Sequence, residues 1–223
     1  MKTFKTLWLI LLFAANITSA GAQETKRSTF YYQRTTLFDV LPVGTEDVVF
    51  LGNSITNGSE WSELFGDLHV KNRGISGDTT DGVYDRLEQI VAGRPKKIFL
   101  MIGINDVSRG RTTDEIVAGI RAIAGRITAE SPATRLYLQS VLPVNDCYGM
   151  FGGHTSRYAQ VAEINAGIQR VAAETGAVYI DLYTPFADPE SGKLRPELTN
   201  DGLHLLGAGY LLWRDVVTPY VIE

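Results

Sequence analysis

The sequence of 223 residues contains a single cysteine and only three histidines. Because Cys147 has no second cysteine to pair with, no disulfide can form within the chain. A lone thiol without activating neighbours is most simply a small loop or core residue. Among His69, His154 and His204 no two stand at metal-ligand spacing, so we predict neither a structural nor a catalytic metal.

Basic runs interleaved with aromatic residues are also missing, and the net charge is −4. Nucleic-acid binding therefore has no electrostatic basis in this chain. The sequence shows no internal repeat, no low-complexity tract and no second domain. Its long uninterrupted apolar run stands at the amino terminus and belongs to a targeting segment.

That segment, residues 1–22, has a basic start with two lysines, an apolar run over residues 7–15 and the small-residue site Ala20-Gly21-Ala22. This order is that of a secretory signal peptide, and the apolar run is too short to span a membrane. We predict cleavage between Ala22 and Gln23 and a secreted or periplasmic protein without stable membrane insertion. No cysteine follows the site, which argues against a lipid anchor. The mature chain, residues 23–223, has 201 residues and a net charge of −6, a size that suits one domain.

Short apolar segments rich in β-branched and aromatic residues alternate with helical patterns along this domain. The predicted strands are residues 48–51, 69–72, 98–102, 136–139 and 178–180. They are apolar on both faces, as expected for a parallel sheet covered on both sides. Before them, residues 30–41 are predicted to form an N-terminal segment, with helical character, that packs against the body.

The helical patterns have apolar residues on one face and recognisable ends. One runs over residues 83–91, and a second follows Thr112, which forms a capping box with Glu115. A third ends at Gly176, and a last helix over residues 206–218 is predicted to stop at Pro219. The alternation predicts an α/β fold, a three-layer αβα sandwich with a mostly parallel five-stranded sheet. The long connections 143–155 and 183–200 follow carboxyl ends of strands, where α/β proteins bind their ligands.

Polar residues stand at those strand ends. Ser54 follows the first strand, Gly77 and Asp78 follow the second, and Asn105 follows the third. Since a serine hydroxyl becomes a good nucleophile only when a base takes its proton, the pair Asp201 and His204, three residues apart, is informative. Asp201 can hold the Nδ1 proton of His204 and leave Nε2 facing Ser54. The N–H groups of Ser54 and Gly77 and the Asn105 amide can donate to an oxyanion.

Each of these residues has an ordinary alternative. Ser54 can be a helix N-cap, and Asn105 can cap a helix in the same way. The loop after the first strand can cradle a phosphate, as in a flavodoxin-like binding protein, but this leaves the Asp201–His204 pair without a role. A third reading is an inactive scaffold that binds sugars, which is disfavoured because each catalytic position is filled.

Four blocks in order resemble those of the SGNH (GDSL-type) hydrolase family: Gly52-Asn53-Ser54-Ile55-Thr56, Gly74-Ile75-Ser76-Gly77-Asp78, Gly103-Ile104-Asn105-Asp106 and Asp201-Gly202-Leu203-His204. The resemblance spans about residues 46–213. It implies a flavodoxin-like αβα fold, Ser54 as nucleophile, His204 as base with Asp201 as its partner, and an oxyanion hole of Ser54, Gly77 and Asn105. It also implies acyl-ester hydrolysis without a metal or cofactor.

One position departs from the family pattern, since Asn53 stands where Asp is most common. No G-x-S-x-G occurs, so the α/β-hydrolase nucleophile elbow does not explain Ser54. Candidate substrate-binding residues are Asn53, Asp78, Tyr148 and His154. We expect a secreted serine esterase that removes short acyl groups, in particular acetyl groups, from small-molecule or glycan esters. The alternative is a lysophospholipase or an esterase like platelet-activating-factor acetylhydrolase.

Overall fold

The computed structural model describes residues 27–222, so the predicted signal peptide lies outside the described residues. Its centre is a five-stranded sheet in the order β2-β1-β3-β4-β5, in which neighbouring strands run parallel. The strands are β1 Val48–Gly52, β2 Val70–Gly74, β3 Lys97–Met101, β4 Arg135–Gln139 and β5 Val178–Ile180. The five predicted strands are confirmed, and each end lies within two residues of its prediction.

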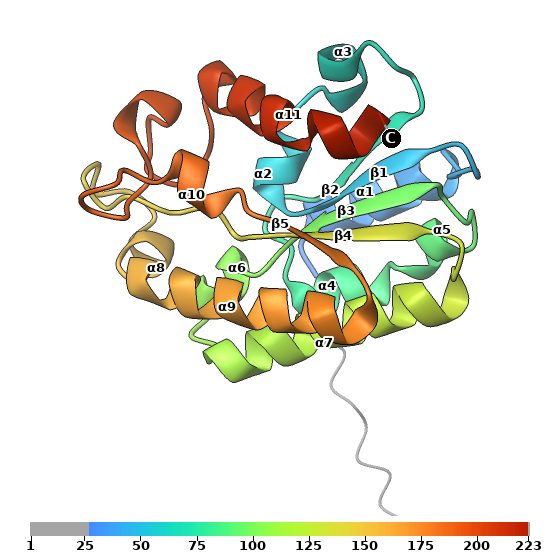
Figure 1. The fold of residues 1–223 in the computed structure, drawn as a ribbon, viewed down its shortest axis with the longest axis horizontal. Coiled ribbons are helices and arrows are strands. Elements are labelled where there is room, and N and C mark those ends of the chain that lie inside the picture. Colours follow the sequence, from blue (N-terminus) through green and yellow to red (C-terminus); the bar gives the residue numbers. More distant parts are fainter. Residues whose placement is uncertain (1–26, 223) are drawn as a thin grey trace, which may run out of the picture.

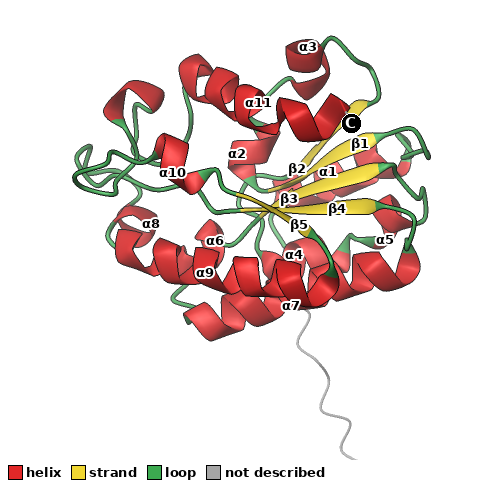
Figure 2. Ribbon diagram, in the orientation of Figure 1, coloured by secondary structure: helices red, strands yellow, loops and turns green. Residues whose placement is uncertain are grey.

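Helices cover both faces of this sheet (Figures 1 and 2). The helices are α1 Thr29–Asp39, α2 Ser54–Asn57, α3 Trp61–Phe65, α4 Thr80–Asp85, α5 Glu88–Val91, α6 Ile104–Ser108, α7 Thr113–Glu130, α8 Gly152–Thr155, α9 Tyr158–Thr175, α10 Tyr183–Phe186, the 3-10 helix η1 Pro196–Leu198 and α11 Gly207–Ile222. Figure 1 shows α7 and α9 along one face and α11 with α3 along the other. The predicted three-layer αβα architecture is thereby confirmed.

Local sequence signals define the long helices. The Thr112 side chain accepts the N–H of Glu115, whose carboxylate accepts the N–H of Thr112 in return, so the predicted capping box starts α7. Gly176 adopts the left-handed conformation at the end of α9. The predicted pattern over residues 83–91 is divided between the short helices α4 and α5.

The predicted stop at Pro219 is wrong, because α11 continues to Ile222. Proline removes one N–H donor from the last turn, but tertiary contacts hold that turn in place. Lys97 Nζ donates to the carbonyl oxygens of Tyr220 (2.7 Å) and Val221 (3.0 Å), which have no partner within the helix. Trp213, which is fully buried, anchors the helix on the core.

The N-terminal segment forms α1, which packs against the body as predicted. Tyr31 and Phe38 bury their rings against Ile75 at the end of β2, and the Tyr31 hydroxyl donates to the Gly82 carbonyl at 2.9 Å. Helix α1 thus lies directly beside the loop that follows β2. No helix within residues 27–222 combines the length and the apolar character needed to cross a membrane.

Candidate active site

Ser54 is the first residue of α2, directly after the buried strand β1. The N-cap is Asn53, whose Oδ1 accepts the N–H of Ile55 at 3.0 Å, so the cap role weighed for Ser54 falls to its neighbour. Several hydrogen bonds hold the short helix, among them those that Tyr210 Oη donates to the Ile55 carbonyl at 2.9 Å and Trp61 Nε1 donates to the Thr56 carbonyl at 2.8 Å. The Ser54 hydroxyl is therefore free for another partner.

That partner is His204. Ser54 Oγ lies 3.1 Å from His204 Nε2, and His204 Nδ1 lies 2.7 Å from Asp201 Oδ2. With the ring proton on Nδ1, His204 donates to the carboxylate and accepts the serine O–H, as general-base activation requires. The arrangement joins residues 150 positions apart in the chain.

The loop before α11 fixes Asp201 and His204 relative to each other. Asp201 Oδ1 accepts the N–H groups of His204 (2.7 Å) and Leu203 (2.8 Å). Thr199 Oγ1 accepts the N–H of Gly202 at 2.9 Å. Burial alone would raise the pKa of Asp201, but the two backbone N–H groups and the imidazole outweigh it, so this pKa lies below its ordinary value. The carboxylate is thus ionised at neutral pH.

Gly202 is required by the loop's close approach to residues 143–155. Its φ is +84°, and a Cβ there would lie 1.9 Å from the Asn145 carbonyl oxygen. Asn145 N donates to the Gly202 carbonyl at 2.8 Å, and Asn145 Nδ2 donates to the Leu194 carbonyl at 2.8 Å. The loop after β4 therefore supports the segment that carries the base.

The predicted oxyanion donors lie in adjoining loops. Ile75 N donates to the Gly52 carbonyl at 3.1 Å, and Asn105 Nδ2 donates to the Asp78 carbonyl at 2.8 Å, which joins the loops after β1, β2 and β3. The N–H groups of Ser54 and Gly77 have no acceptor among the described residues. Gly77 has a φ of +77°, a conformation that side chains disfavour. These free N–H groups are available to an oxyanion.

The other two histidines do not contact Ser54. His69 Nδ1 lies 3.1 Å from Asp47 Oδ1, a contact that joins the start of β2 to the residue before β1. His154 Nε2 lies 3.0 Å from Asn105 Oδ1. Burial, together with the nearby His204, holds the pKa of His154 below its ordinary value. His204 is therefore the histidine placed to act as base.

Two predicted substrate-binding side chains are instead buried. Asn53 is 1% exposed and caps α2, and the Asp78 carboxylate accepts from Arg86 Nε at 2.9 Å with both side chains 1% exposed. Burial raises the pKa of Asp78, and the Arg86 guanidinium opposes that rise. Arg86 Nη2 also donates to the Gly52 carbonyl at 3.1 Å. These side chains hold the loops together and expose almost no surface to a substrate.

Tyr148 and His154 remain partly exposed in the loop after β4. The Tyr148 hydroxyl donates to the Pro196 and Thr199 carbonyls, each at 3.2 Å, while part of its surface reaches solvent. Phe151, which is also partly exposed, stands edge-on to His204 with its centroid 5.1 Å from that ring. Aromatic surface thus borders the base.

The sequence patterns did not identify Arg86 and Thr199 as site residues, although the position of Arg86 carried a signal. Arg86 stands three residues after Val83 and four before Ile90, inside the apolar stripe that identified the helical pattern. A cation on a buried stripe needs a buried anion. Thr199, by contrast, is recognisable only from its contacts, because a threonine before a turn is common.

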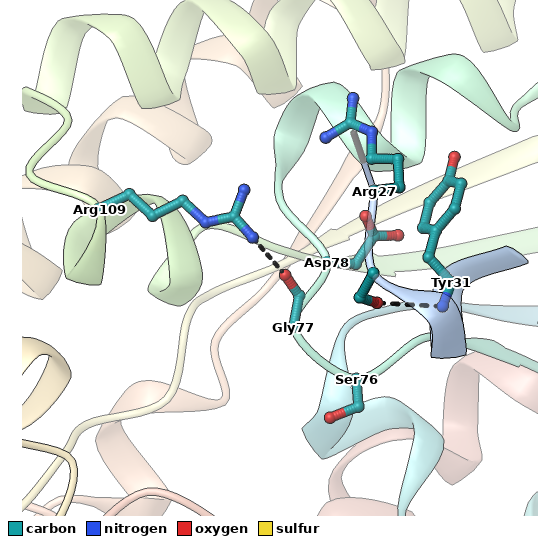
Figure 3. A pocket seen from close by; sticks show the side chains of 7 residues that line it. Arg27, Tyr31, Ser76, Gly77, Asp78 and Arg109 are labelled. Atoms are coloured by element: carbon teal, nitrogen blue, oxygen red, sulfur yellow. Dashed lines mark hydrogen bonds between the residues drawn. The ribbon is translucent and has the colours of Figure 1, made fainter. Parts of the chain in front are cut away.

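A small cavity of about 170 Å³ adjoins the predicted oxyanion donor Gly77 (Figure 3). Its lining is about equally polar and apolar and comprises Arg27, Ser28, Tyr31, Ser76, Gly77, Asp78 and Arg109. Arg109 Nη2 donates to the Gly77 carbonyl at 3.0 Å, which anchors the loop from the side of α6. Across residues 27–222, no three His, Cys, Asp or Glu side chains gather as metal ligands would.

Comparisons with known proteins agree with this geometry. Residues 50–212 match the model of the GDSL-like Lipase/Acylhydrolase family. Human platelet-activating factor acetylhydrolase IB subunit alpha2 is 29% identical over 174 residues, which are 74% of this chain and 71% of the human protein.

Solved structures share the fold. A Streptococcus pneumonia protein provisionally described as a platelet activating factor is 28% identical, with a TM-score of 0.78 over 86% of this chain and 92% of its own. An acetylxylan esterase from Geobacillus stearothermophilus is 20% identical, with a TM-score of 0.64 over 80% of this chain and 95% of its own. At that identity the esterase supports the fold alone.

Proposed function

The chain belongs to the GDSL-like lipase/acylhydrolase family and is a carboxylic ester hydrolase, and from that premise we propose a secreted or periplasmic serine esterase that removes acetyl and other short acyl groups from carbohydrates. The observation that carries the proposal is the relay from Ser54 Oγ to His204 Nε2 (3.1 Å) and from His204 Nδ1 to Asp201 (2.7 Å). Such a relay converts a weakly nucleophilic hydroxyl into an attacking group.

In the acylation step, Ser54 Oγ attacks the ester carbonyl carbon and its proton passes to His204 Nε2. Asp201 stabilises the imidazolium that forms. The carbonyl oxygen becomes an oxyanion, which accepts from the N–H groups of Ser54 and Gly77 and from Asn105 Nδ2. His204 then returns the proton to the alcohol oxygen, the C–O bond breaks, and the acyl group remains on Ser54.

Deacylation repeats these steps with water as the nucleophile. Water gives its proton to His204 and attacks the acyl carbon, and the same donors hold the second oxyanion. His204 returns the proton to Ser54 Oγ as the carboxylic acid leaves. Each proton is transferred by His204, so no metal or redox group is needed for the balance of the reaction.

Acetyl as the acyl group is supported by a relative of the chain. The human relative is named as an acetylhydrolase, which points to the same acyl group.

A carbohydrate as the alcohol part is supported by the loop after β4. Tyr148 and Phe151 expose part of their rings there, and Phe151 borders His204. Partly exposed aromatic rings beside polar groups can stack on sugar faces while the polar groups bind hydroxyls. A secreted location, expected from residues 1–22, would bring the enzyme to external glycans.

A lipid-type ester is the second candidate, and a specific observation favours it. The human relative acts on platelet-activating factor by its name, and it aligns with 74% of this chain. Both candidates share acetyl release and differ only in the alcohol. The alcohol therefore has to be identified by substrate competition.

The test is a panel of acetyl esters assayed with the purified mature protein. Acetate release is measured from acetylated xylan, pectin and acetylated sialic acid, with platelet-activating factor and a lysophospholipid in parallel, and Ser54→Ala as the control. We expect Ser54-dependent release that is fastest on a glycan. Faster release from platelet-activating factor would favour the second candidate, and cleavage of the lysophospholipid alone would contradict the short acyl group.

A further inference from the structure

The side-chain amide of Asn105 lies between two fixed partners. On one side Nδ2 is 2.8 Å from the Asp78 carbonyl oxygen, and on the other Oδ1 is 3.0 Å from His154 Nε2. A backbone carbonyl can only accept a hydrogen bond, so the atom facing Asp78 must be the nitrogen. The atom facing His154 is then the oxygen, and His154 Nε2 must carry a proton to donate to it. The two contacts define both the amide orientation and the histidine tautomer.

The orientation of the Asn105 amide determines whether it can donate an N–H to the oxyanion. Nδ2 of Asn105 has two hydrogens, of which one is used by Asp78, so the other is left to donate. A half-turn of the amide would exchange nitrogen and oxygen, place Oδ1 against the Asp78 carbonyl, and remove the free N–H. Asn105 is 7% exposed, so water has little access to compensate for such a turn.

We propose that His154 is a positioning residue for the hydrolysis proposed above: its Nε2–H holds the Asn105 amide in the one orientation that presents an N–H to the oxyanion. His154 does not touch the reacting atoms and acts through Asn105. It comes from α8, in the loop after β4, whereas Asn105 comes from α6 after β3. The loop 143–155 thus supports the oxyanion donor as well as the base.

The charge state of His154 suits this role. Burial and the nearby His204 keep its pKa below the ordinary value, so the ring is neutral near pH 7 and keeps a single N–H. His204 becomes positively charged when it takes the serine proton. A neutral donor can orient Asn105 without placing a second positive charge beside that imidazolium.

His154 also stands near Phe151, with ring centroids 6.0 Å apart, so a purely packing role must be separated from the donor role. Glutamine can place an amide N–H where His154 Nε2 lies, whereas the shorter asparagine places its amide nearer the position of Nδ1. His154→Gln and His154→Asn are therefore a matched pair, alike in polarity and different in the reach of the donor.

The experiment measures kcat and KM on p-nitrophenyl acetate for the wild type, His154→Ala, His154→Asn, His154→Gln, Asn105→Ala and the Asn105→Ala/His154→Ala double variant. We expect Asn105→Ala to lower kcat about 10²–10³-fold. His154→Ala and His154→Asn should lower kcat about tenfold with KM within about twofold, and His154→Gln should recover most of the loss. In the Asn105→Ala background, His154→Ala should cause no further loss.

The proposal is overturned if His154→Ala costs the same factor with and without Asn105, or if His154→Gln is as slow as His154→Asn. It is also overturned if the loss appears in KM alone, which would indicate substrate binding. Ser54→Ala in the same assay separates a failure of the positioning role of His154 from a failure of the proposed function. If it is inactive and His154→Ala is unimpaired, only the positioning role fails; if it retains activity, the proposed function fails with it.

Discussion

Replacing Arg86 with Met should strongly destabilise the protein. Arg86 and Asp78 are buried together, with both side chains 1% exposed and 2.9 Å between Nε and Oδ2. Methionine keeps much of the volume but leaves the Asp78 carboxylate with the Thr79 N–H (3.0 Å) as its remaining hydrogen-bond donor. Breaking a buried ion pair by removing one partner costs about 3–5 kcal/mol. This is a large share of the roughly 5–15 kcal/mol that stabilises a typical domain.

The loss is measured by urea unfolding followed by tryptophan fluorescence, since Trp61 and Trp213 are almost completely buried and report on the core. With an m-value of about 2 kcal/mol/M, the midpoint should fall by about 1.5–2.5 M. The control is the double variant Asp78→Asn/Arg86→Met, which leaves no charge behind. It should recover at least about half of the lost free energy, because a neutral pair avoids the buried unpaired charge.

The pH dependence of the stability of Arg86→Met is a second test of the unpaired Asp78 carboxylate. Burial already raises the pKa of Asp78, and loss of Arg86 raises it further above the unfolded value of about 3.9. A raised carboxyl pKa contributes stability at low pH that is lost as the pH rises through the folded value. The penalty of Arg86→Met should therefore be smaller at pH 5 than at pH 8. A penalty below about 1 kcal/mol at pH 8, or a double variant no more stable than the single one, would refute the reasoning.

Three further predictions concern the site. Asp201→Asn should lower kcat on p-nitrophenyl acetate about 10³–10⁴-fold, because the amide no longer holds the Nδ1 proton of His204. A loss of less than tenfold would contradict the relay. Gly77→Ala should cost about 1–2 kcal/mol in urea unfolding, since φ is +77° and no atom lies within 4 Å of the added Cβ, so strain acts without a clash. A larger loss would mean that the loop is more tightly packed. The pKa of His154 is lowered in the folded state, so this residue contributes stability that is lost as the pH falls below its unfolded pKa of about 6.5. Between pH 8 and pH 5 the wild type should therefore lose more unfolding free energy than His154→Gln. Equal losses would contradict the lowered pKa.

The strands and the four site segments were predictable because their signals are local. An apolar run such as residues 48–51, followed at once by Gly52-Asn53-Ser54, marks a strand end and a polar loop without knowledge of any partner. Parallel topology then brings successive strand ends to one edge. The Thr112 capping box and the Gly176 cap were predictable for the same reason.

What escaped prediction depends on partners distant in sequence. Pro219 alone predicts the end of the helix. The helix continues because Lys97, more than a hundred residues earlier, donates hydrogen bonds to the carbonyl oxygens of the following turn. Asp78 reads as a ligand-facing carboxylate until Arg86 is found against it. The orientation of Asn105 likewise depends on His154, 49 positions away, which no periodicity reveals. Local patterns predict elements, whereas the pairing of buried polar groups requires the assembled fold.

The central claim, that Ser54 is the nucleophile activated by His204, is tested most directly by a fluorophosphonate reaction followed by peptide mass spectrometry. We predict one adduct, on Ser54, that forms rapidly in the wild type, far more slowly in His204→Ala, and not at all in Ser54→Ala. An adduct on another residue, or undiminished labelling of Ser54→Ala, would contradict the claim.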